Sequence, residues 1–360
     1  MSMFIDELIN FQDQTFSDIH LHEGRHPRWR TKAGEIEIMP GLNPVTKSDF
    51  ESILVQADHS LESEGAEARV DAVLADNKGQ TDFASVINGV RYRVSMYWHN
   101  SRKLGVSMRK ISETVPDITE LGLPQKVLEL IDRKSGIILV TGETNSGKST
   151  TLAAMIQHRA KRKEHIITVE DPVEYRHHEN ESGALITQRE VGPYRDTQSF
   201  DDALRSALRE DPDVIMIGEI RDRISAEIAM KAADTGHLVL ATLHTRSAPR
   251  TVERFRNMFP QEQENAVLQQ FSDAALLILS QALVPSADMS RRVLAYEMMT
   301  NTTAIAGNIA KNNINQILRD METEREMITL NKCLEKMVAE GKITPETAKR
   351  TSYLPKELKV

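Results

Sequence analysis

The chain has 360 residues and a formal net charge of −8, with hydrophobic and charged fractions of 40% and 27%. This length allows about two domains with a buried core, and the composition is typical of a globular protein. The acidic balance excludes the overall basic field that attracts nucleic acid or an anionic membrane, so no nucleic-acid partner is expected. Cys333 is the single cysteine, which excludes an internal disulfide and a cysteine-based zinc module.

The N-terminal stretch MSMFIDELINFQDQ is acidic and too polar for a signal peptide. No window approaches the roughly 18 unbroken apolar residues of a membrane span. We therefore expect a soluble intracellular protein with no transmembrane segment. The longest apolar stretch, AALLILSQALV from Ala274, is interrupted by polar residues, and its interpretation is a buried helix.

The pattern of hairpin and helix signals in residues 1–112 predicts a small α/β domain. Ala33-Gly34 separates RWRTK from EIEIM, and Asn88-Gly89 joins DFASVI to VRYRVSMYW, which are two hairpin signals. Helical spacing of apolar residues occurs in IDELINFQ and in TKSDFESILVQADHSL.

Residues 113–125 contain two X-Pro steps and no periodicity, which indicates a linker. Beyond it, the β-rich runs GIILVTG, EHIITVED, DVIMIGE and HLVLATLH alternate with helical segments. This alternation predicts a mainly parallel sheet covered on both faces, in a domain spanning 126–290. Residues 291–360 are expected to form a helical domain, in which Thr344-Pro345 begins a helix.

The sequence GETNSGKS, from Gly142 to Ser149, matches the phosphate-loop pattern and has a strand before it and a helix after it. Backbone N–H groups and the helix dipole would hold a phosphate, Lys148 would contact the β- and γ-phosphates, and Ser149 would ligate Mg²⁺. ATP and Mg²⁺ are the expected cofactors. The candidate nucleotide-binding residues are Gly142, Thr144, Asn145, Ser146, Gly147, Lys148, Ser149 and Thr150.

Two residues of this loop are unusual. Asn145 can adopt a positive φ and so can occupy a position where glycine is common. Glu143 carries a carboxylate that would repel phosphate if it pointed inward. Because main-chain donors do most of the binding, the Glu143 side chain need only point outward.

Other expected strand ends carry polar side chains, and ligands of such sheets bind beyond the carboxyl ends of the strands. Glu170 and Glu219 are candidates to orient water, or to hold Mg²⁺ through water together with Ser149. His237 and His244 lie on either side of one strand. A histidine can sense the presence of the γ-phosphate by forming a hydrogen bond to it. The candidate catalytic residues are therefore Glu219, Glu170, His237 and His244.

The succession GETNSGKST, ITVEDPVEY, QREVG, LRSALREDPDVIMIGEIRD and TGHLVLATLHT resembles the type II/IV secretion ATPase superfamily. Within it, the chain is similar to the PilT-type pilus retraction ATPases, from SDIHLHEG near the N-terminus to VLAYEMM near the C-terminus. The resemblance implies a PAS-like N-terminal α/β domain and a RecA-like P-loop core with a helical C-terminal extension.

The resemblance also implies a function. It is that of a homohexameric motor in the bacterial cytoplasm, which couples ATP hydrolysis to type IV pilus retraction and meets an inner-membrane platform protein. It gives Glu219 the role of catalytic glutamate. It further implies nucleotide contacts from N-terminal arginines, here Arg93, Arg102 and Arg109.

The family motif AIRNLIRE is replaced by AIAGNIAK, with Ala306 and Ala310 at the arginine positions. A related role in a conjugative or other type IV secretion system therefore stays open. Three further classes are a nucleic-acid-dependent ATPase, a small-molecule kinase and a nucleotide-gated structural protein. The pI of about 5.8 and the aromatic content of 5% speak against the first of these.

Overall fold

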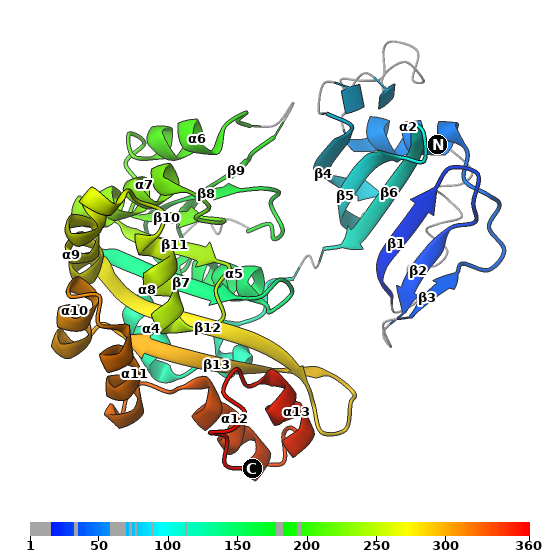
Figure 1. Cartoon of the computed structure of the whole chain (residues 1–360). Coiled ribbons are helices and arrows are strands. Elements are labelled where there is room, and N and C mark those ends of the chain that lie inside the picture. The colour runs from blue at the N-terminus through cyan, green and yellow to red at the C-terminus, as the bar shows by residue number, and fades with distance from the viewer. Residues whose placement is uncertain are drawn as a thin grey trace. The chain divides into compact units, whose positions relative to one another are not determined.

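The computed structural model describes residues 16–31, 35–57, 70–71, 74–75, 78–87, 90–111, 114–177, 183–192 and 196–360. The chain divides into two compact units, each of which has its own sheet (Figure 1). The first unit extends to Thr114 and includes the short segment Pro172–Tyr175, and the second contains the rest. The linker expected at 113–125 and the helical domain expected from residue 291 stay predictions.

The first unit is built on an antiparallel sheet of order β3-β2-β1-β6-β5-β4. Its elements are β1 (Phe16–His22), β2 (Arg28–Thr31), β3 (Ile36–Ile38), α2 (Lys47–Ala57), β4 (Gln80–Ile87), β5 (Val90–His99) and β6 (Lys103–Lys110). Both expected hairpins are confirmed as strand pairs, β2 with β3 and β4 with β5. Their turns at 33–34 and 88–89, and the helix expected within residues 5–12, lie outside the described residues.

The predicted amphipathic helix of the first unit is confirmed as α2. Phe50 and Ile53 of this helix are fully buried in a cluster with alternate residues of the strands, including Leu21 and Val94. Successive side chains of β5 and β6 point to opposite faces of the sheet, so the residues between the buried ones lie on the face away from this cluster. The arginines at 93 and 109 are on that opposite face.

The second unit alternates strands with helices before it ends in a run of helices. Its elements are η2 (Ile118–Leu121), α4 (Gln125–Ile131), β7 (Gly136–Gly142), α5 (Lys148–Arg159), β8 (His165–Glu170), β9 (Leu185–Glu190), α6 (Phe200–Ala207), β10 (Val214–Ile217), α7 (Arg223–Asp234), β11 (Leu238–Leu243), α8 (Ala248–Arg256), η3 (Gln261–Gln263), α9 (Glu264–Ala274), β12 (Ala275–Pro285), β13 (Arg292–Thr300), α10 (Thr303–Ala310), α11 (Ile314–Thr323), α12 (Leu330–Ala339) and α13 (Pro345–Thr351). Thr344 caps α13 and Pro345 begins it, as expected.

The sheet of the second unit has the order β13-β12-β7-β11-β10-β8-β9. All neighbouring pairs are parallel except β12 with β13, so the expected mainly parallel sheet is confirmed. Two expectations are wrong. The apolar run after Ala274 is the strand β12 and not a helix, and the first residues of the expected helical region form the strand β13.

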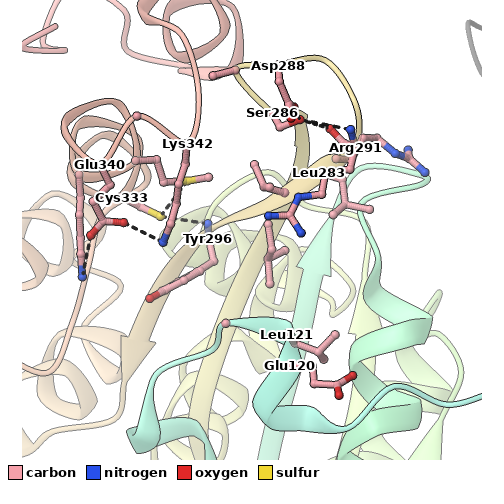
Figure 2. A pocket seen from close by; sticks show the side chains of 18 of the residues that line it. Glu120, Leu121, Leu283, Ser286, Asp288, Arg291, Tyr296, Cys333, Glu340 and Lys342 are labelled. Atoms are coloured by element: carbon pink, nitrogen blue, oxygen red, sulfur yellow. Dashed lines mark hydrogen bonds and ion pairs between the residues drawn. The ribbon is translucent and has the colours of Figure 1, made fainter.

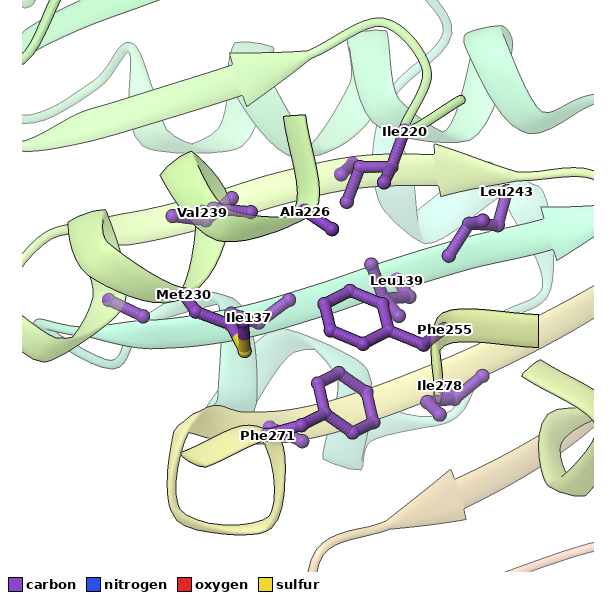
Figure 3. Close-up of a cluster of buried hydrophobic side chains, with 14 of the residues drawn as sticks. Ile137, Leu139, Ile220, Ala226, Met230, Val239, Leu243, Phe255, Phe271 and Ile278 are labelled. Carbon is purple, nitrogen blue, oxygen red and sulfur yellow. The ribbon is translucent and has the colours of Figure 1, made fainter. Parts of the chain in front are cut away.

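Helices cover both faces of this sheet, as the sequence predicts. On one face, α7, α8 and α9 pack against β7 and β11, and Phe255 and Phe271 stack with their ring centroids 4.4 Å apart (Figure 3). On the other face, Val127 of α4 and Leu152 of α5 pack against β7 and its neighbours. The central strands β7, β10 and β11 are buried along their whole length, so the carboxyl edge of the sheet can position side chains accurately.

A buried carboxylate ties the C-terminal helices to the sheet. Glu297 on β13 is 1% exposed, and its two oxygens accept the N–H of Ala248 at 2.6 Å and of Leu330 at 3.3 Å, at the first residues of α8 and α12. The Tyr353 hydroxyl donates a third hydrogen bond to it. Burial raises the pKa of Glu297 above its usual value, and these three donors oppose the rise.

We expect Tyr353→Phe to reduce the free energy of unfolding at pH 8 by about 1.5–3 kcal/mol, because it leaves a buried charge with one donor fewer. The loss should be smaller near pH 5. The pKa of Glu297 is higher in the folded chain than in the unfolded chain, so its carboxylate is protonated in the folded chain at a higher pH. Once protonated, the carboxyl is neutral, and losing the Tyr353 hydrogen bond costs less than it does for a buried carboxylate. Urea denaturation at the two pH values measures both quantities.

Tyr296→Phe is the matched control. Its hydroxyl has no hydrogen-bond partner within the part of the chain that the structure describes. An equal loss of stability in the two variants would contradict the role given to Tyr353.

Candidate functional site

The phosphate loop connects the end of β7 to the start of α5. Gly142 and Gly147 have φ values of 141° and 88°, which L-residues with side chains rarely adopt. A Cβ on Gly142 would lie 2.4 Å from the carbonyl oxygen of Gln281, so this position also requires glycine for space. Asn145 has a φ of 66°, as the sequence predicts.

Lys148 points back into the loop that it follows. Its Nζ donates to the carbonyl oxygens of Gly142 at 3.0 Å and Glu143 at 2.7 Å, and the residue is only 8% exposed. Ser146 Oγ is buried and has no hydrogen-bond partner among the described residues. The loop therefore brings together the groups that bind a phosphate. They are the buried ammonium of Lys148, the unsatisfied hydroxyl of Ser146 and the backbone N–H groups at the start of α5.

Glu219 is fixed by the residues on either side of it. The carbonyl of Gly218 accepts a hydrogen bond from the Thr242 hydroxyl at 2.5 Å, and the N–H of Ile220 donates to the carbonyl of Thr242 at 2.9 Å. These bonds join the ends of β10 and β11. They hold the backbone of Glu219 firmly at the carboxyl edge of the sheet.

The Glu219 carboxylate has two cationic or polar neighbours. Arg221 Nε lies 2.7 Å from Oε2, and His244 Nε2 lies 3.4 Å from Oε1. Arg221 also reaches Asp171 at 3.4 Å, so it bridges the ends of two strands. The structure thus brings together Glu219 and His244, two of the four expected catalytic residues.

Glu170 ends β8 beside this group and is 8% exposed. It accepts hydrogen bonds from Thr168 Oγ1 at 2.7 Å and from Gln188 Nε2 at 3.2 Å. A Cβ on Gly218 would lie 3.3 Å from Cα of Glu170, so the small residue at 218 allows the ends of β8 and β10 to approach closely. The two expected carboxylates therefore belong to adjacent strand ends.

The two histidines of the expected pair are at opposite ends of β11. Its register pairs Leu243 with Thr141, which places His244 level with the phosphate loop, whereas His237 precedes the residue paired with Gly136. His237 Nδ1 is 2.9 Å from the Ala232 carbonyl oxygen at the end of α7. Within this chain, His237 is not brought to the loop.

His244 is close enough to Lys148 to be affected by its charge. Burial first, and then the positive charge of Lys148, lower the pKa of His244, while Glu219 opposes the change. The imidazole is therefore neutral at pH 7, with one nitrogen able to donate and the other able to accept a hydrogen bond.

The three expected arginines belong to the first unit. Arg93 and Arg109 are directly paired across β5 and β6, and their side chains contact Glu174 at 3.5 Å and Asp18 at 2.8 Å. Arg102 is in the turn at the other end of this hairpin, and its guanidinium lies 5.0 Å from the centre of the Trp98 ring. Two of the arginines are therefore neighbours, and the third is separate.

Sequence reasoning missed Arg221 and Gln188 as parts of the site. Arg221 was visible as a cation two residues after Glu219, a spacing that places both side chains on one side of an extended segment. Gln188 begins the motif QREVG of the resemblance, but no role was expected for it, and β9 was not anticipated as a strand.

A cavity of about 660 Å³ in the second unit is lined by residues of η2, of the hairpin formed by β12 and β13, and of α12 (Figure 2). Leu121, Leu283, Tyr296 and Cys333 contribute to its apolar lining. Leu283 also adjoins the loop, because a Cβ on Gly147 would lie 3.3 Å from its Cδ1. Leu283 thus lies against both the cavity and the loop, but the residues of the loop itself do not line the cavity.

A mainly parallel sheet with a phosphate loop after one strand and acidic side chains after two other strands defines the RecA-like class of P-loop nucleotide hydrolases. The family described as type II/IV secretion system protein matches residues 81–351. The chain belongs to this family and is a nucleotide-binding ATPase.

The chain is similar over nearly its whole length to characterised relatives. The type IV pilus retraction ATPase PilT of Pseudomonas aeruginosa is 37% identical over 98% of this chain and 99% of its own. A crystal structure of the pilus retraction motor PilT with bound ADP matches with a TM-score of 0.85 and 39% identity, covering 99% of both chains. The Legionella pneumophila ATPase DotB shares the fold, with a TM-score of 0.79 and 24% identity over 96% of this chain and 94% of its own.

Among the described residues, no helix is both long and apolar enough to cross a membrane.

Proposed function

We propose that this chain is a motor ATPase that couples ATP hydrolysis to retraction of a type IV pilus. The observation that carries the proposal is the contact of Glu219 with His244 beside the loop that bears Lys148. It occurs in a chain that resembles a pilus retraction ATPase over 98% of its length. We place the protein in the bacterial cytoplasm, at the inner membrane through a platform protein.

The loop supplies the donors for the polyphosphate. Lys148 exchanges its two carbonyl acceptors for phosphate oxygens, and the N–H groups from Thr144 to Thr150 surround the β-phosphate. The Ser149 hydroxyl would hold Mg²⁺, with Glu170 or Glu219 reaching the ion through water, and the ion would neutralise charge between the β- and γ-phosphates.

Glu219 acts on the water that attacks the γ-phosphate. Its carboxylate accepts the proton of that water as the new P–O bond forms and the bond to ADP breaks. Arg221 orients the carboxylate through a hydrogen bond of 2.7 Å. Neutral His244, whose Nε2 faces this carboxylate, redirects its single N–H to the γ-phosphate when ATP is bound and so distinguishes ATP from ADP.

We propose that the active form is a homohexamer in which a neighbour's first unit completes the site. Arg102 is the best candidate for a contact in trans. It has no acidic partner in the described part of the chain, and its guanidinium is held over an aromatic ring, ready to meet a phosphate. Arg93 and Arg109 already have carboxylate partners and would first have to release them.

Turnover per subunit should rise with protein concentration as the ring assembles, and Arg102→Ala should abolish most of this rise. The physical reason is that a trans arginine stabilises charge on the transferring phosphoryl group, with an effect on the order of 10³-fold. Phosphate release measured over a hundredfold range of protein concentration, together with the mass in solution, tests this. Arg28→Ala, which removes an exposed arginine of the same unit, is the control.

Two outcomes would contradict the ring model. Turnover per subunit that is independent of concentration means that the site is complete in one chain. A rise that Arg102→Ala leaves intact means that another residue completes it.

A role in a type IV secretion system is the second candidate. It is favoured by α10, where Ala306 and Ala310 replace the two arginines of the retraction motif beside the buried Ile305 and Ile309. Restoration of surface motility in a host that lacks its own retraction ATPase distinguishes the two. A chain that hydrolyses ATP but does not restore motility would favour the secretion role.

A further inference from the structure

The acidic residue of the phosphate loop is paired with an arginine from a neighbouring strand end. Glu143 Oε1 lies 2.5 Å from Nε of Arg246. The two side chains are 63% and 72% exposed, so both can be reached by a ligand at the edge of the sheet. The Glu143 side chain points away from the loop interior, whereas its carbonyl oxygen accepts the Lys148 ammonium at 2.7 Å.

The backbone around Arg246 is anchored. Ser247 caps α8 and is 4% exposed, and the next N–H, that of Ala248, donates to Glu297. On the other side, the hydroxyls of Thr245 and Thr251 are 2.6 Å apart. The guanidinium of Arg246 therefore extends from a fixed base to the loop, and its position does not depend on the ion pair alone.

Pointing outward reduces the repulsion between Glu143 and a bound polyphosphate, and a cation beside the carboxylate reduces it further. This carboxylate belongs to the loop that binds a polyphosphate, and two like charges within a Debye length of about 8–10 Å repel each other. An arginine at 2.5 Å cancels the carboxylate charge as seen from the phosphates. Arg246 also follows His244 by two residues, so one short segment contacts the loop acid and the catalytic carboxylate.

We infer that Arg246 is a positioning residue for nucleotide binding, which neutralises Glu143 and holds the phosphate loop to the strand end that carries His244. The Glu143–Arg246 pair thus makes an acidic phosphate loop competent to bind ATP. The inference rests on the proposed function of this site, in that it takes the loop to be the place where ATP binds.

The experiment is equilibrium binding of ADP, of the ATP analogue ATPγS and of adenosine to four forms of the full chain: wild type, Arg246→Gln, Glu143→Gln and the double variant. Arg246→Gln should weaken ADP and ATPγS binding roughly tenfold, because it leaves the carboxylate unneutralised. Glu143→Gln in the same chain should restore binding to within about twofold of wild type. The affinity for adenosine, which has no phosphate, should be the same in all four forms.

Exposed ion pairs contribute little to folding, so the unfolding midpoint should not move in any of these variants. The effect of Arg246→Gln should also shrink as salt is added. Arg254→Gln, which removes an exposed arginine of α8, is the matched control and should bind as wild type does.

Unchanged ADP affinity in Arg246→Gln would overturn the inference, since the pair would then be an inert surface contact. A double variant that stays as weak as Arg246→Gln would also overturn it, because Arg246 would then bind the nucleotide directly. Failure of the wild-type chain to bind ADP would instead contradict the proposed function itself.

Discussion

Replacing Glu219 with glutamine should lower kcat for ATP hydrolysis by about 10²–10³-fold and leave the Kd for ADP within about threefold. Glutamine keeps the size of the side chain and can still contact His244 Nε2, yet it cannot accept the proton of the attacking water. The hydrogen bonds that fix the backbone on both sides, at Gly218 and Ile220, do not involve the side chain and remain. Phosphate release under saturating ATP, together with ADP titration, separates chemistry from binding.

The control must remove an equal charge without touching the site. Glu227→Gln does so, because Glu227 is exposed on α7 and its contact with Arg223, at 3.6 Å, is a surface pair between residues one turn apart. It should retain wild-type kcat. If Glu219→Gln also retains it, Glu219 is not the general base, and Glu170 becomes the residue to replace next.

The phosphate loop was predictable because all its information is local. A strand, two glycines, a lysine and a helix follow one another within 20 or so residues. The same is true of Asn145, whose φ of 66° follows from the ability of asparagine to adopt the left-handed conformation. Glu219 and Glu170 were predictable because the carboxyl ends of parallel strands share one edge of a sheet.

The strand β12 was not predictable in this way. It lies between β7 and β13 and is buried on both faces, so its apolar residues show no alternation. A short apolar run without alternation looks the same in a buried strand and in a buried helix. Pairing with β7, which lies far away in the sequence, decides between them.

The partners of the site residues were equally hidden. Arg246 follows the strand β11, and only the closeness of that strand end to the phosphate loop makes it the ion-pair partner of Glu143. The sequence suggested that both histidines flanking β11 belong to the site, but the length of the strand separates them. Six residues in a strand separate its ends by about 20 Å, so only one of the two histidines can be at the loop.

Lys148→Met should weaken ADP binding on the order of 100-fold and reduce ATP turnover at least as much. The ammonium is the only charge that the loop itself directs to the phosphates, since Glu143 is acidic and is committed to Arg246. Charge-assisted hydrogen bonds contribute about 1.5–3 kcal/mol each, and each 1.4 kcal/mol is a factor of ten in Kd. Methionine retains the unbranched chain and so preserves most of the packing of this buried residue.

The variant also removes the hydrogen bonds that Lys148 Nζ donates to the carbonyl oxygens of Gly142 and Glu143. The unfolding midpoint must therefore be measured alongside ADP binding, with Lys161→Met, an exposed lysine after α5, as the control for charge. A folded Lys148→Met chain that binds ADP normally would mean that main-chain donors alone hold the phosphates. In that case the loop would serve as a nest of N–H groups, and Glu143 would need no neutralisation by Arg246.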